Sequence, residues 1–550
     1  MNFNPLVFKQ QFPLFDQQEN QSLVYLDNAA TTQKPQCVID AISDFYIKSN
    51  ANAHRSGYRL AQKATNIVES VRKKVAYFIN SQQTESIVFT SGATESLNII
   101  ANGFKGKLQA DDEILITIAE HHANLVPWQV LAKSESANLV FAESYNDLLE
   151  KITKATKVVA ISAAGNILGE RIPDGFIKAI KRRAPDVSVA VDASQLVAHQ
   201  KIDVNAMGCD FLACSAHKFY GPSGIGILYG RRDLLDHWPP LQFGGEMVKT
   251  VDLHSCEYHH SPMRLETGTA PLSAIAGLGA CIDFVCKYPR QAIRDYEQGL
   301  IELLHNCLDQ LRQKYPAITV LTSAKNNVGI AALSVKKPYS IYDLGFWLDE
   351  NDIAVRVGHH CAQPLWNTKN LDGGLRISLA AYNTEDDINR LIDSIDNFFQ
   401  HISVNFLTEN KSFDQGIFND DFSKCAYQSL IRIKPWQRRY QQIIEWGKCI
   451  SFKSAIREQQ YSIKACESSL WLAVKQQNER YFFAADSDSA IVKGLLALIL
   501  CRVQGEHIEA IERIDFKQYF AALQLDKHLS VSRINGLNAV VNTINKIVGH

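Results

Sequence analysis

The sequence lacks the close cysteine pairs that mark several common structural and redox sites. Its 12 cysteines are irregularly spaced, and no two of them form a Cys-x-x-Cys pair. This absence argues against a zinc ribbon, a thioredoxin-like motif and a disulfide scaffold, because each of these needs thiols at set spacings. We therefore expect free thiols in a reducing compartment, where they stay available for chemistry.

Long apolar runs and an excess of one charge are also absent. The longest apolar run lies near residues 494–501, well short of the ~18 residues of a membrane span, and residues 1–15 do not have a signal-peptide pattern. The 57 basic and 58 acidic residues leave a net charge of -1. Such a balance gives no bulk attraction to nucleic acid or to an anionic membrane. We expect a cytoplasmic protein that binds neither.

Helical and strand patterns alternate from about residue 20 to residue 400. Residues 58–79 carry apolar side chains at helical spacing. Short apolar runs typical of buried strands occupy residues 86–90, 157–164, 188–195 and 210–218. This alternation predicts an α/β fold with a mostly parallel sheet, whose ligands bind at the carboxyl ends of the strands.

A polar stretch around residues 401–425, rich in Asn, Asp and Ser, separates this region from a second one. Beyond it lie a helical pattern, two runs typical of paired strands and a strongly apolar helix. A chain of 550 residues is also too long for a single core. We predict a first domain over 1–403, a linker over 404–420 and a smaller α+β domain over 421–550.

Polar residues at the predicted strand ends suggest a cofactor pocket. Lys218 follows a strand and precedes the glycine-rich FYGPSGIGILYG, and a desolvated lysine at such a place can form a Schiff base. Asp192 closes another strand, where a carboxylate can pair with a protonated pyridine nitrogen. SGATES (91–96) opens a helix whose N-terminus suits a phosphate, and EHHAN (120–124) offers an imidazole for stacking. Each feature alone is weak, but together they predict a pyridoxal-phosphate (PLP) pocket.

The segment RVGHHCAQP (356–364) places Cys361 beside two histidines. From its residue types alone it fits a metal site, a nucleophile or an ordinary buried thiol. Adjacent histidines on an extended segment point to opposite faces, and no second ligand pair such as HExxH is present. The metal alternative is therefore disfavoured, and we expect no bound metal.

The first ~400 residues resemble the SufS-type (type II) cysteine desulfurases, in the class V branch of fold-type I PLP-dependent transferases. The matching motifs follow the family's order: YLDNAATTQKP, NAHRSGYRL, SGATES, EHHANLVPW, GNILGE, VDASQ, ACSAHKFYGPSGIGILYG, FGGEM, RLETGTA, VRVGHHCAQPLW and RISLAAYNT. The resemblance implies a large domain with a mostly parallel sheet, a small α/β domain, bound PLP and a homodimer.

The resemblance also implies roles for single residues. Lys218 is the expected Schiff-base lysine and mover of the Cα proton, and Cys361 is the expected nucleophile. The other implied site residues are His121 stacked on the ring, Asp192 at its nitrogen, Gln195 at its hydroxyl, Thr94, Ala93, Ser215 and His217 at the phosphate, Thr269 reaching in from a second protomer, Asn166 and Arg376 at the substrate carboxylate, and Arg356 beside the thiol.

Some positions depart from the family's usual motifs. Ala93 stands where the family usually carries Thr, so one hydroxyl contact to phosphate is missing. SAAGN and CSAHK replace the common HVSN and SGHK forms, and GTAPLS lacks the usual Pro-Asn after Gly-Thr. Polar groups are retained around each change, so we expect effects on affinity more than on mechanism.

The implied reaction converts L-cysteine to L-alanine and leaves the sulfur on Cys361 as a persulfide. Sulfur attacking sulfur needs a thiolate, which the neighbouring imidazoles and Arg356 would favour. The short GHHCAQP loop matches type II desulfurases, which are slow until a sulfur-accepting partner activates them. Selenocysteine lyase activity is an implied side reaction.

The C-terminal region resembles SufE, the sulfur-acceptor partner of these enzymes. The matching segments are residues 436–448, 464–472, 482–500 and 532–544. They imply an acceptor thiol at Cys466, with Asp488 and Arg533 near it, although Ala465 stands where the family usually has Gly. For the remaining thiols of this region, Cys425, Cys449 and Cys501, we expect ordinary buried cysteines.

Taken together, these patterns predict a PLP-dependent cysteine desulfurase that passes sulfur from Cys361 to Cys466, for iron–sulfur cluster assembly on a downstream scaffold. A second hypothesis keeps PLP but makes the chain an aminotransferase or β-lyase, which Cys361 tests. A third treats the tail as a docking module with Cys466 incidental. Thiolated cofactors or tRNA stay open as the final destination of the sulfur, and so does transfer within or between protomers.

Overall fold

The structure is a computed structural model that describes residues 3–54, 57–336, 339–407, 417–433, 436–451, 453–463, 469–487, 489–525, 529 and 531–548. The chain forms two compact units. The first consists of Met1–Ser334 and Leu348–Ile395, and the second of Val335–Trp347 and Asp396–His550.

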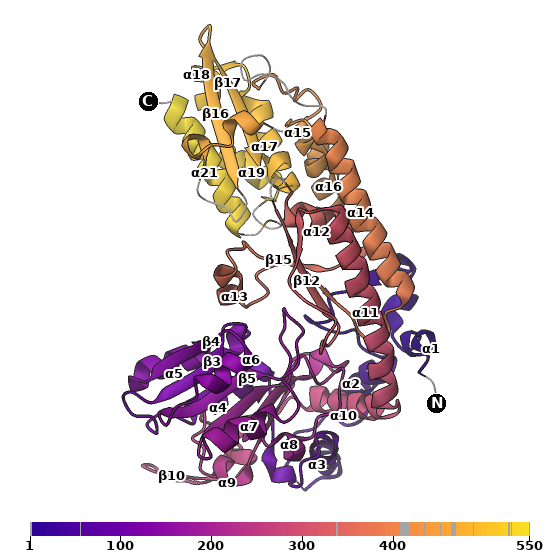
Figure 1. Ribbon diagram of the computed structural model, residues 1–550, viewed down its shortest axis with the longest axis vertical. Coiled ribbons are helices and arrows are strands. Elements are labelled where there is room, and N and C mark those ends of the chain that lie inside the picture. The colour runs from indigo at the N-terminus through magenta and orange to yellow at the C-terminus, as the bar shows by residue number, and fades with distance from the viewer. Residues whose placement is uncertain are drawn as a thin grey trace. The chain divides into compact units, whose positions relative to one another are not determined.

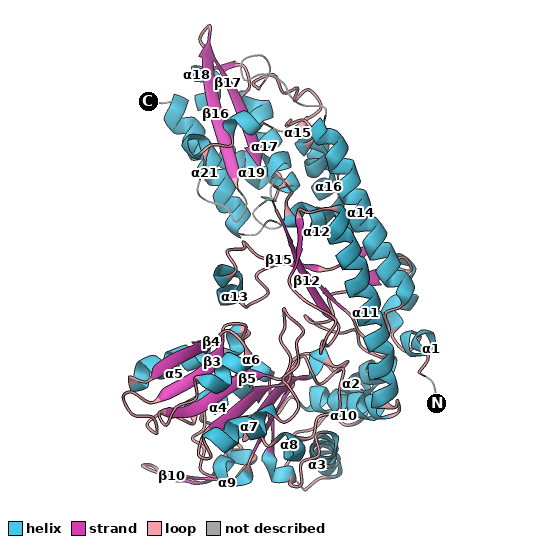
Figure 2. Cartoon of the chain, viewed as in Figure 1, coloured by secondary structure: helices cyan, strands magenta, loops and turns pink. Residues whose placement is uncertain are grey.

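A seven-stranded sheet is the centre of the first unit (Figures 1 and 2). Its strand order is β2-β8-β7-β6-β5-β3-β4, with parallel pairing from β7 to β4 and antiparallel pairing of β8 with both neighbours. The strands are β2 (Ile87–Thr90), β3 (Glu113–Thr117), β4 (Asn138–Ala142), β5 (Thr156–Ser162), β6 (Ser188–Asp192), β7 (Phe211–Ser215) and β8 (Gly226–Gly230).

Alternate residues of these strands pack into two separate hydrophobic cores, one on each face of the sheet. Val159 and Val189 belong to a cluster with helices α3, α7 and α10, whereas Val158 and Ala190 belong to a cluster with α4 and α5. Successive strand residues point to opposite faces, so a sheet covered by helices on both sides needs nearly continuous apolar runs. The helices of this unit are α1 (Pro5–Lys9), α2 (Gln36–Lys48), α3 (Arg59–Phe78), α4 (Ala93–Asn102), α5 (Val126–Glu135), α6 (Tyr145–Glu150), α7 (Phe176–Arg183), α8 (Val204–Met207), α9 (Arg232–Leu235), α10 (Leu272–Cys286), α11 (Arg290–Lys314) and α13 (Gln363–Thr368).

A smaller sheet carries the segment that contains Cys361. Its order is β11-β12-β15-β14, and β14 pairs antiparallel with β15, Arg356 facing Arg376. The strands of this sheet are β11 (Ile318–Val320), β12 (Ile330–Val335), β14 (Arg356–Gly358) and β15 (Gly374–Ser378). Two further pairs lie outside both sheets. Strand β1 (Val24–Tyr25) pairs with β13 (Ile353–Ala354), and β9 (Val248–Val251) forms a hairpin with β10 (Cys256–Tyr258).

The second unit contains a three-stranded sheet, β16-β17-β18, packed against helices. Helix α17 is apolar nearly all round because it lies in the centre of this core. The elements are β16 (Leu470–Gln477), β17 (Arg480–Ser487), β18 (Glu506–His507), α15 (Tyr427–Arg432), α16 (Trp436–Gly447), α17 (Ala490–Val503), α18 (Ile508–Glu512), α19 (Phe516–Ala522) and α21 (Val531–Val548). Helices α12 (Ile341–Glu350) and α14 (Glu385–Leu407) each have residues in both units.

The α/β fold with a mostly parallel sheet and a smaller α+β region is confirmed. The helix expected over 58–79 is α3, and the two runs expected to pair near the C-terminus are the antiparallel β16 and β17. Helix α14 continues to Leu407 and so occupies the first residues of the predicted linker, whose residues 408–416 lie outside the described ones. The boundaries at 403 and 421 stay predictions.

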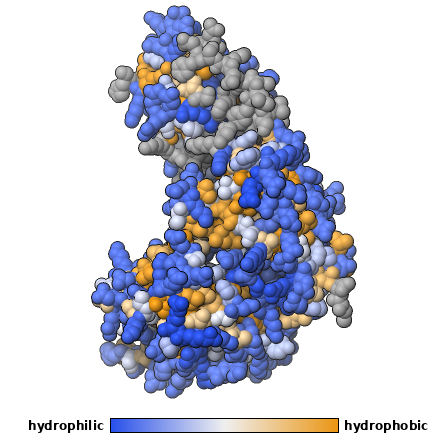
Figure 3. Space-filling model, in the orientation of Figure 1, coloured by the Kyte–Doolittle hydropathy of each residue, from blue (hydrophilic) through white to orange (hydrophobic). Residues whose placement is uncertain are grey.

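The surface of the first unit exposes some large apolar side chains. The face drawn in Figure 3 is mostly hydrophilic, with apolar residues reaching it in separate patches. In the first unit, Leu253 is 93% exposed in the β9–β10 hairpin, and Phe243 and Val251 are also exposed. Among the described helices, none alone has the length and apolarity of a membrane span; α10 and α11, bent by 79°, meet both criteria only as a pair.

Candidate active site

The large sheet brings several predicted site residues to the carboxyl ends of its strands. Asp192 is the last residue of β6, and Ser215 is the last residue of β7. Lys218 ends the 3-10 turn that follows β7, and His121 caps a similar turn after β3. Parallel strands end at one edge of a sheet, which is why residues as far apart in the chain as His121 and Lys218 meet there.

Charged groups surround the Lys218 amine. Burial lowers the pKa of Lys218 below its ordinary value, Asp192 raises it, and Arg376 lowers it again. Cys361 and Arg356 act on the same amine electrostatically. A lysine with a lowered pKa holds more of the neutral amine, the form needed for nucleophilic and proton-transfer chemistry.

His121 and His217 are neutral imidazoles near neutral pH. Burial and then the Lys218 charge lower the pKa of each to about 4. The Nδ1 atom of His121 accepts a hydrogen bond from the Ala123 backbone N–H at 3.1 Å, so the ring proton resides on Nε2. A neutral ring in this fixed orientation suits stacking on another aromatic ring.

Asp192 and Gln195 keep groups available for a ligand. Asp192 is 7% exposed, and its Oδ1 accepts a hydrogen bond from the Ser194 N–H at 2.9 Å. Gln195 donates its amide N–H to the Ala29 carbonyl at 2.9 Å, which leaves its Oε1 to accept a proton from a hydroxyl.

Helix α4 begins at a site prepared for an anion. The Ala93 backbone N–H donates to the Ser215 hydroxyl at 2.8 Å, and Thr94 is exposed in the first turn. A Cβ at Gly226 would lie 2.5 Å from the Gly92 backbone, so only glycine lets β8 approach this turn so closely. The first N–H groups of a helix and its dipole favour a phosphate.

Two arginines from the small sheet share one carboxylate. Arg376 Nη2 donates to Asp27 Oδ1 and Arg356 Nε donates to Asp27 Oδ2, both at 3.1 Å. Arg376 also donates to the Asn166 carbonyl at 3.1 Å, and Asn166 Nδ2 donates to the His360 carbonyl at 2.7 Å. Arg376, Asn166 and the Cys361 loop are thus joined directly. Asp27 was not singled out from the sequence, although it lies in the YLDNAATTQKP motif.

The Cys361 loop presents an exposed thiol on a strained backbone. His360 and Cys361 have φ angles of 51° and 55°, a left-handed conformation that non-glycine residues rarely adopt and that is often found at functional sites. The His122 N–H donates to the Cys361 carbonyl at 2.7 Å, and the His360 ring nitrogen Nε2 lies 3.0 Å from the Gly374 carbonyl. Burial and then Arg376 lower the pKa of His360 to about 3, so this imidazole is neutral.

The site fits PLP and its amino-acid substrate. Three buried polar atoms near it have no hydrogen-bond partner, namely Asn166 Oδ1, His360 Nδ1 and Arg376 Nε. Buried polar atoms are normally paired, so such a group of orphans indicates a place for a polar ligand. Together with Lys218 and the start of α4, they supply contacts for a carboxylate, a phosphate and an aldehyde carbon.

The remaining predicted site residues are not joined to this cluster. Thr269 is exposed in the loop before α10, so its predicted contact with a second protomer stays a prediction. Cys466 and Asp488 lie outside the described residues, and Arg533 lies on α21 without a described side chain. Among the described residues, no three His, Cys, Asp or Glu side chains converge as metal ligands.

Described residues on either side of positions 464–468 make hydrogen bonds within the second unit. The Ile463 N–H donates to the Leu470 carbonyl at 2.9 Å, and the Ser487 hydroxyl donates to the Ser469 carbonyl at 2.8 Å. Next to Ser487, the buried Asp486 accepts hydrogen bonds that no sequence pattern predicts.

The thiols of the second unit partly follow expectation. Cys425 is buried, whereas Cys449 and Cys501 are only partly buried. The Cys425 and Cys449 sulfurs lie 3.8 Å apart. Burial raises the pKa of the Cys425 thiol above its ordinary value, as does the neighbouring Cys449.

Comparison with known proteins agrees with the PLP pocket and exposed thiol that the geometry indicates. The aminotransferase class-V family profile matches residues 24–391. A cysteine desulfurase of Serratia proteamaculans is 42% identical over 394 residues, which are 70% of this chain and 95% of the relative. A probable cysteine desulfurase of Streptomyces coelicolor is 40% identical, covering 71% of this chain and 97% of its own length. The chain belongs to the cysteine desulfurases of the class V aminotransferase family.

Solved structures of cysteine desulfurases share its fold. The CsdA enzyme of Escherichia coli, in an S-sulfonic acid form, has a TM-score of 0.66 and 34% identity, covering 72% of this chain and 99% of that chain. The apo enzyme of Thermococcus onnurineus has a TM-score of 0.68 and 31% identity, covering 73% and 100%. A cysteine desulfurase of this class is PLP-dependent, so the predicted cofactor is confirmed.

The second part of this desulfurase also has a family. The SufE profile, described as an Fe-S metabolism associated domain, matches residues 425–548. A desulfurase and a sulfur-acceptor domain therefore occupy one chain, as predicted, and together they indicate sulfur transfer for iron–sulfur metabolism.

Proposed function

We propose that this desulfurase passes the sulfur of L-cysteine from Cys361 to Cys466 of its own SufE domain, and from there to an iron–sulfur scaffold. The observation that carries the proposal is the exposed Cys361 on its strained loop, in the same chain as a SufE domain. Fusion keeps the acceptor at an effective concentration on the order of millimolar, so delivery does not depend on an encounter between separate proteins.

The pocket residues bind and orient the cofactor. PLP, when bound, supplies an electron-withdrawing ring that lets the substrate lose its Cα proton. Lys218 would hold the cofactor and move that proton at Nζ, because its lowered pKa makes the neutral amine accessible. The neutral His121 would stack on the ring, Asp192 would keep its nitrogen protonated, and Gln195 would bind its hydroxyl.

The phosphate and substrate ends of the pocket lie on different elements. Ala93, Thr94, Ser215 and His217 would bind the phosphate at the start of α4. Arg376 and Asn166 would bind the substrate carboxylate, since Arg376 keeps an unpaired buried Nε and guanidinium groups bind carboxylates well. Asp27 would keep the Arg376 and Arg356 side chains in place.

Cys361 would carry out the sulfur step as a thiolate. Its sulfur attacks the substrate sulfur, the substrate carbon–sulfur bond breaks, and a persulfide remains on Cys361 while alanine leaves. A Cys466 thiolate then attacks the terminal sulfur of that persulfide and releases the Cys361 thiolate. The neutral His360 cannot supply positive charge, so Arg356 and Arg376 are the cations that would stabilise the thiolate.

A homodimer would complete the site. Thr269 is exposed on its own chain, and the apolar Leu253, Val251 and Phe243 are exposed on or next to the β9–β10 hairpin. Exposed apolar clusters mark association surfaces, so we place a second protomer there, with Thr269 reaching its phosphate site. The described cysteines are all free, which suits a cytoplasmic enzyme.

Persulfide mapping tests the transfer. The PLP-loaded full chain is incubated with ³⁵S-labelled cysteine, digested without reductant and examined by mass spectrometry. We expect label on Cys361 within the first turnover and on Cys466 afterwards. In Cys466→Ser the label should stay on Cys361, in Cys361→Ser neither position should be labelled, and Cys256→Ser, which alters an exposed thiol in the hairpin, should behave as wild type.

Two outcomes would contradict the proposal. Label on Cys361 that never reaches Cys466 in the intact chain would make the tail a docking module. Alanine and sulfide produced at the normal rate by Cys361→Ser would exclude Cys361 as the nucleophile and favour a lyase. Mixing Cys361→Ser with Cys466→Ser chains then separates transfer within a protomer from transfer between protomers.

A further inference from the structure

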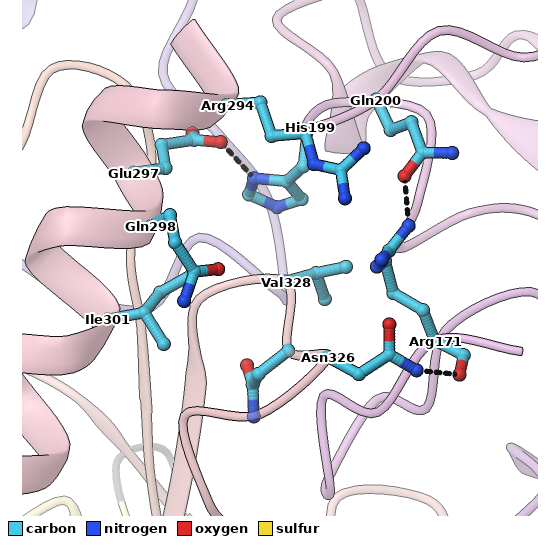
Figure 4. Close-up of a pocket in the computed structure, with 10 residues that line it drawn as sticks. Arg171, His199, Gln200, Arg294, Glu297, Gln298, Ile301, Asn326 and Val328 are labelled. Carbon is cyan, nitrogen blue, oxygen red and sulfur yellow. Dashed lines mark hydrogen bonds and ion pairs between the residues drawn. The ribbon is translucent and has the colours of Figure 1, made fainter. Parts of the chain in front are cut away.

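A second pocket in the first unit lies apart from all the predicted site residues. It has a volume of about 220 Å³ and lies between α11, the loop after β5, the segment after β6 and the segment before β12. Figure 4 shows its lining. The residues are Arg171, His199, Gln200, Arg294, Glu297, Gln298, Ile301, Asn326, Asn327 and Val328.

Two guanidinium groups face this space from opposite walls. Arg171 comes from the loop after β5 and Arg294 from α11, and both extend toward the same part of the pocket (Figure 4). Burial lowers the pKa of Arg171, and the Arg294 charge lowers it further, while Asp174 opposes both. Among the described residues, no carboxylate forms an ion pair with either arginine, and Arg294 makes no hydrogen bond.

The one carboxylate of the pocket lining, Glu297, faces His199 and lies within the electrostatic reach of an arginine outside the pocket. Glu297 Oε2 lies 3.0 Å from His199 Nδ1, and the buried Arg290 acts electrostatically on Glu297 from outside the pocket. The Arg290 guanidinium is itself fixed, because its Nη2 donates to the Val197 and Gln200 carbonyls at 2.7 and 3.0 Å. The pocket lining thus has two arginines against one carboxylate, and Arg290 adds a positive charge just outside it.

We propose that this pocket binds a small dianion, such as phosphate or a short dicarboxylate, between Arg171 and Arg294. Guanidinium groups bind such oxygens through two parallel N–H bonds. Arg171 is already oriented, because its side chain donates to Gln200 Oε1 and its carbonyl accepts the Asn326 side-chain N–H at 2.7 Å. The volume limits the ligand to a small molecule or to the anionic end of a larger one.

The ligand would connect α11 to a loop of the active site. Arg171 bridges to Ala164, and the Gly165 N–H donates to the Glu170 carbonyl at 3.0 Å, which closes a short loop. That loop carries Asn166, which donates to the His360 carbonyl. A dianion held by Arg171 and Arg294 would link this loop to α11. It would also raise the free energy of unfolding, by an amount that grows with the logarithm of its concentration above the dissociation constant.

Calorimetric titration with inorganic phosphate tests the proposal. The PLP-loaded full chain is used, so that the cofactor's own phosphate site is filled, and chloride keeps the ionic strength constant. We expect saturable binding and a melting temperature that rises with phosphate. Arg294→Gln, an exposed change on α11, should weaken binding roughly tenfold or more, and Arg171→Gln should do the same.

Controls separate this site from general charge effects and from turnover. Arg312→Gln alters another exposed arginine of α11, one paired with Asp309, and should bind phosphate as wild type does. Cys361→Ser should also bind normally, which makes the result independent of the sulfur-transfer proposal. Malonate in place of phosphate shows which kind of dianion is preferred. Binding of neither anion, or equal phosphate affinity in wild type and Arg294→Gln, would overturn the proposal.

Discussion

Asp192 in the first unit and Asp486 in the second are both buried carboxylates at the end of a strand, yet their surroundings differ. Asp192 accepts one hydrogen bond, from the Ser194 N–H at 2.9 Å. Asp486 is 0% exposed and accepts hydrogen bonds from Arg457 Nε at 2.7 Å and from the Lys453 backbone N–H at 3.0 Å. It also forms an ion pair with Lys493, whose Nζ lies 3.1 Å from Oδ1. The Asp192 carboxylate can therefore still accept hydrogen bonds from a ligand, whereas both oxygens of Asp486 already have partners within the protein.

The same difference holds for the polar groups around each carboxylate. In the first unit, three buried polar atoms without partners belong to the joined Arg376, Asn166 and His360 side chains, and others lie elsewhere in that unit. Among the described residues of the second unit, no buried side-chain nitrogen or oxygen lacks a hydrogen bond. Unpaired buried groups cost stability, so three of them on joined side chains indicate a binding site, whereas fully paired groups indicate a structural role.

Replacing Asp192 should therefore damage activity far more than stability. In Asp192→Asn the neutral amide no longer stabilises a protonated pyridine nitrogen, and we expect alanine formation to fall about a thousandfold, or ~4 kcal/mol. Alanine release from cysteine and urea unfolding of the apo chain measure the two effects. Asp186→Asn, an exposed change just before β6, is the matched control. A large loss of stability with activity retained would show that Asp192 is structural.

Replacing Asp486 should have the opposite effect. Asp486→Asn leaves Arg457 and Lys493 without their carboxylate, and removal of one partner from a buried ion pair costs about 3 kcal/mol. Hydrogen exchange of the full chain should show the loss in β16, β17 and α17, while alanine formation with an external thiol as acceptor is unchanged. Asp421→Asn, at an exposed position of the same unit, is the control. Unchanged exchange in β16 and β17 would mean that Asp486 contributes no net stability.

Asp27 combines both kinds of environment and should give a smaller, mixed effect. It holds Arg376 and Arg356, so Asp27→Asn frees two side chains at the expected carboxylate site. We expect KM for cysteine to rise roughly tenfold, about the worth of one charge-assisted hydrogen bond, with a smaller change in kcat. Steady-state kinetics distinguish this from a catalytic role, in which kcat would fall while KM stayed constant.

These three carboxylates show which features of the site could be predicted from the sequence. Asp192 could be predicted because it ends a buried strand, and strand ends in a parallel sheet converge. Asp27 could not, since its partner Arg376 lies 349 residues away and joins it only when β15 pairs beside β12. Asp486 could not be predicted either. In the sequence it is one residue of an apolar strand, and the cations that surround it come from a separate loop and a separate helix. Local periodicity predicts elements, but it does not predict which distant charges they bring together.

The strand pairing shows the same limit. The apolar runs of residues 188–195 and 210–218 predict strands, and β6 and β7 are indeed formed there as parallel neighbours. The antiparallel placement of β8 between β7 and β2 was not predicted. It depends on the close approach of Gly226 to Gly92, which no periodic pattern shows.

Acid should separate the two units by the pH at which each weakens. Burial holds the pKa of His121 and of His217 at about 4 in the folded first unit, whereas an unfolded histidine titrates near 6.5. The unfolded chain thus binds more protons below pH ~6.5, and stability of the first unit falls from there to about pH 4. Burial raises the pKa of Asp486, but Lys493 and Arg457 outweigh it and hold the pKa below its ordinary value, so the second unit loses this contribution only below pH ~4.

Hydrogen exchange of the full chain at pH 7 and pH 5, corrected for intrinsic rates, measures this difference. At pH 5 we expect weaker protection in β6 and β7 and unchanged protection in β16 and β17. The effect is the smallest of the four, because PLP binds only the folded state and offsets part of the loss. A second unit that opened first at pH 5 would mean that titration of Asp486 is not what limits it in acid, and the contrast between an open and a saturated carboxylate would then rest on activity alone.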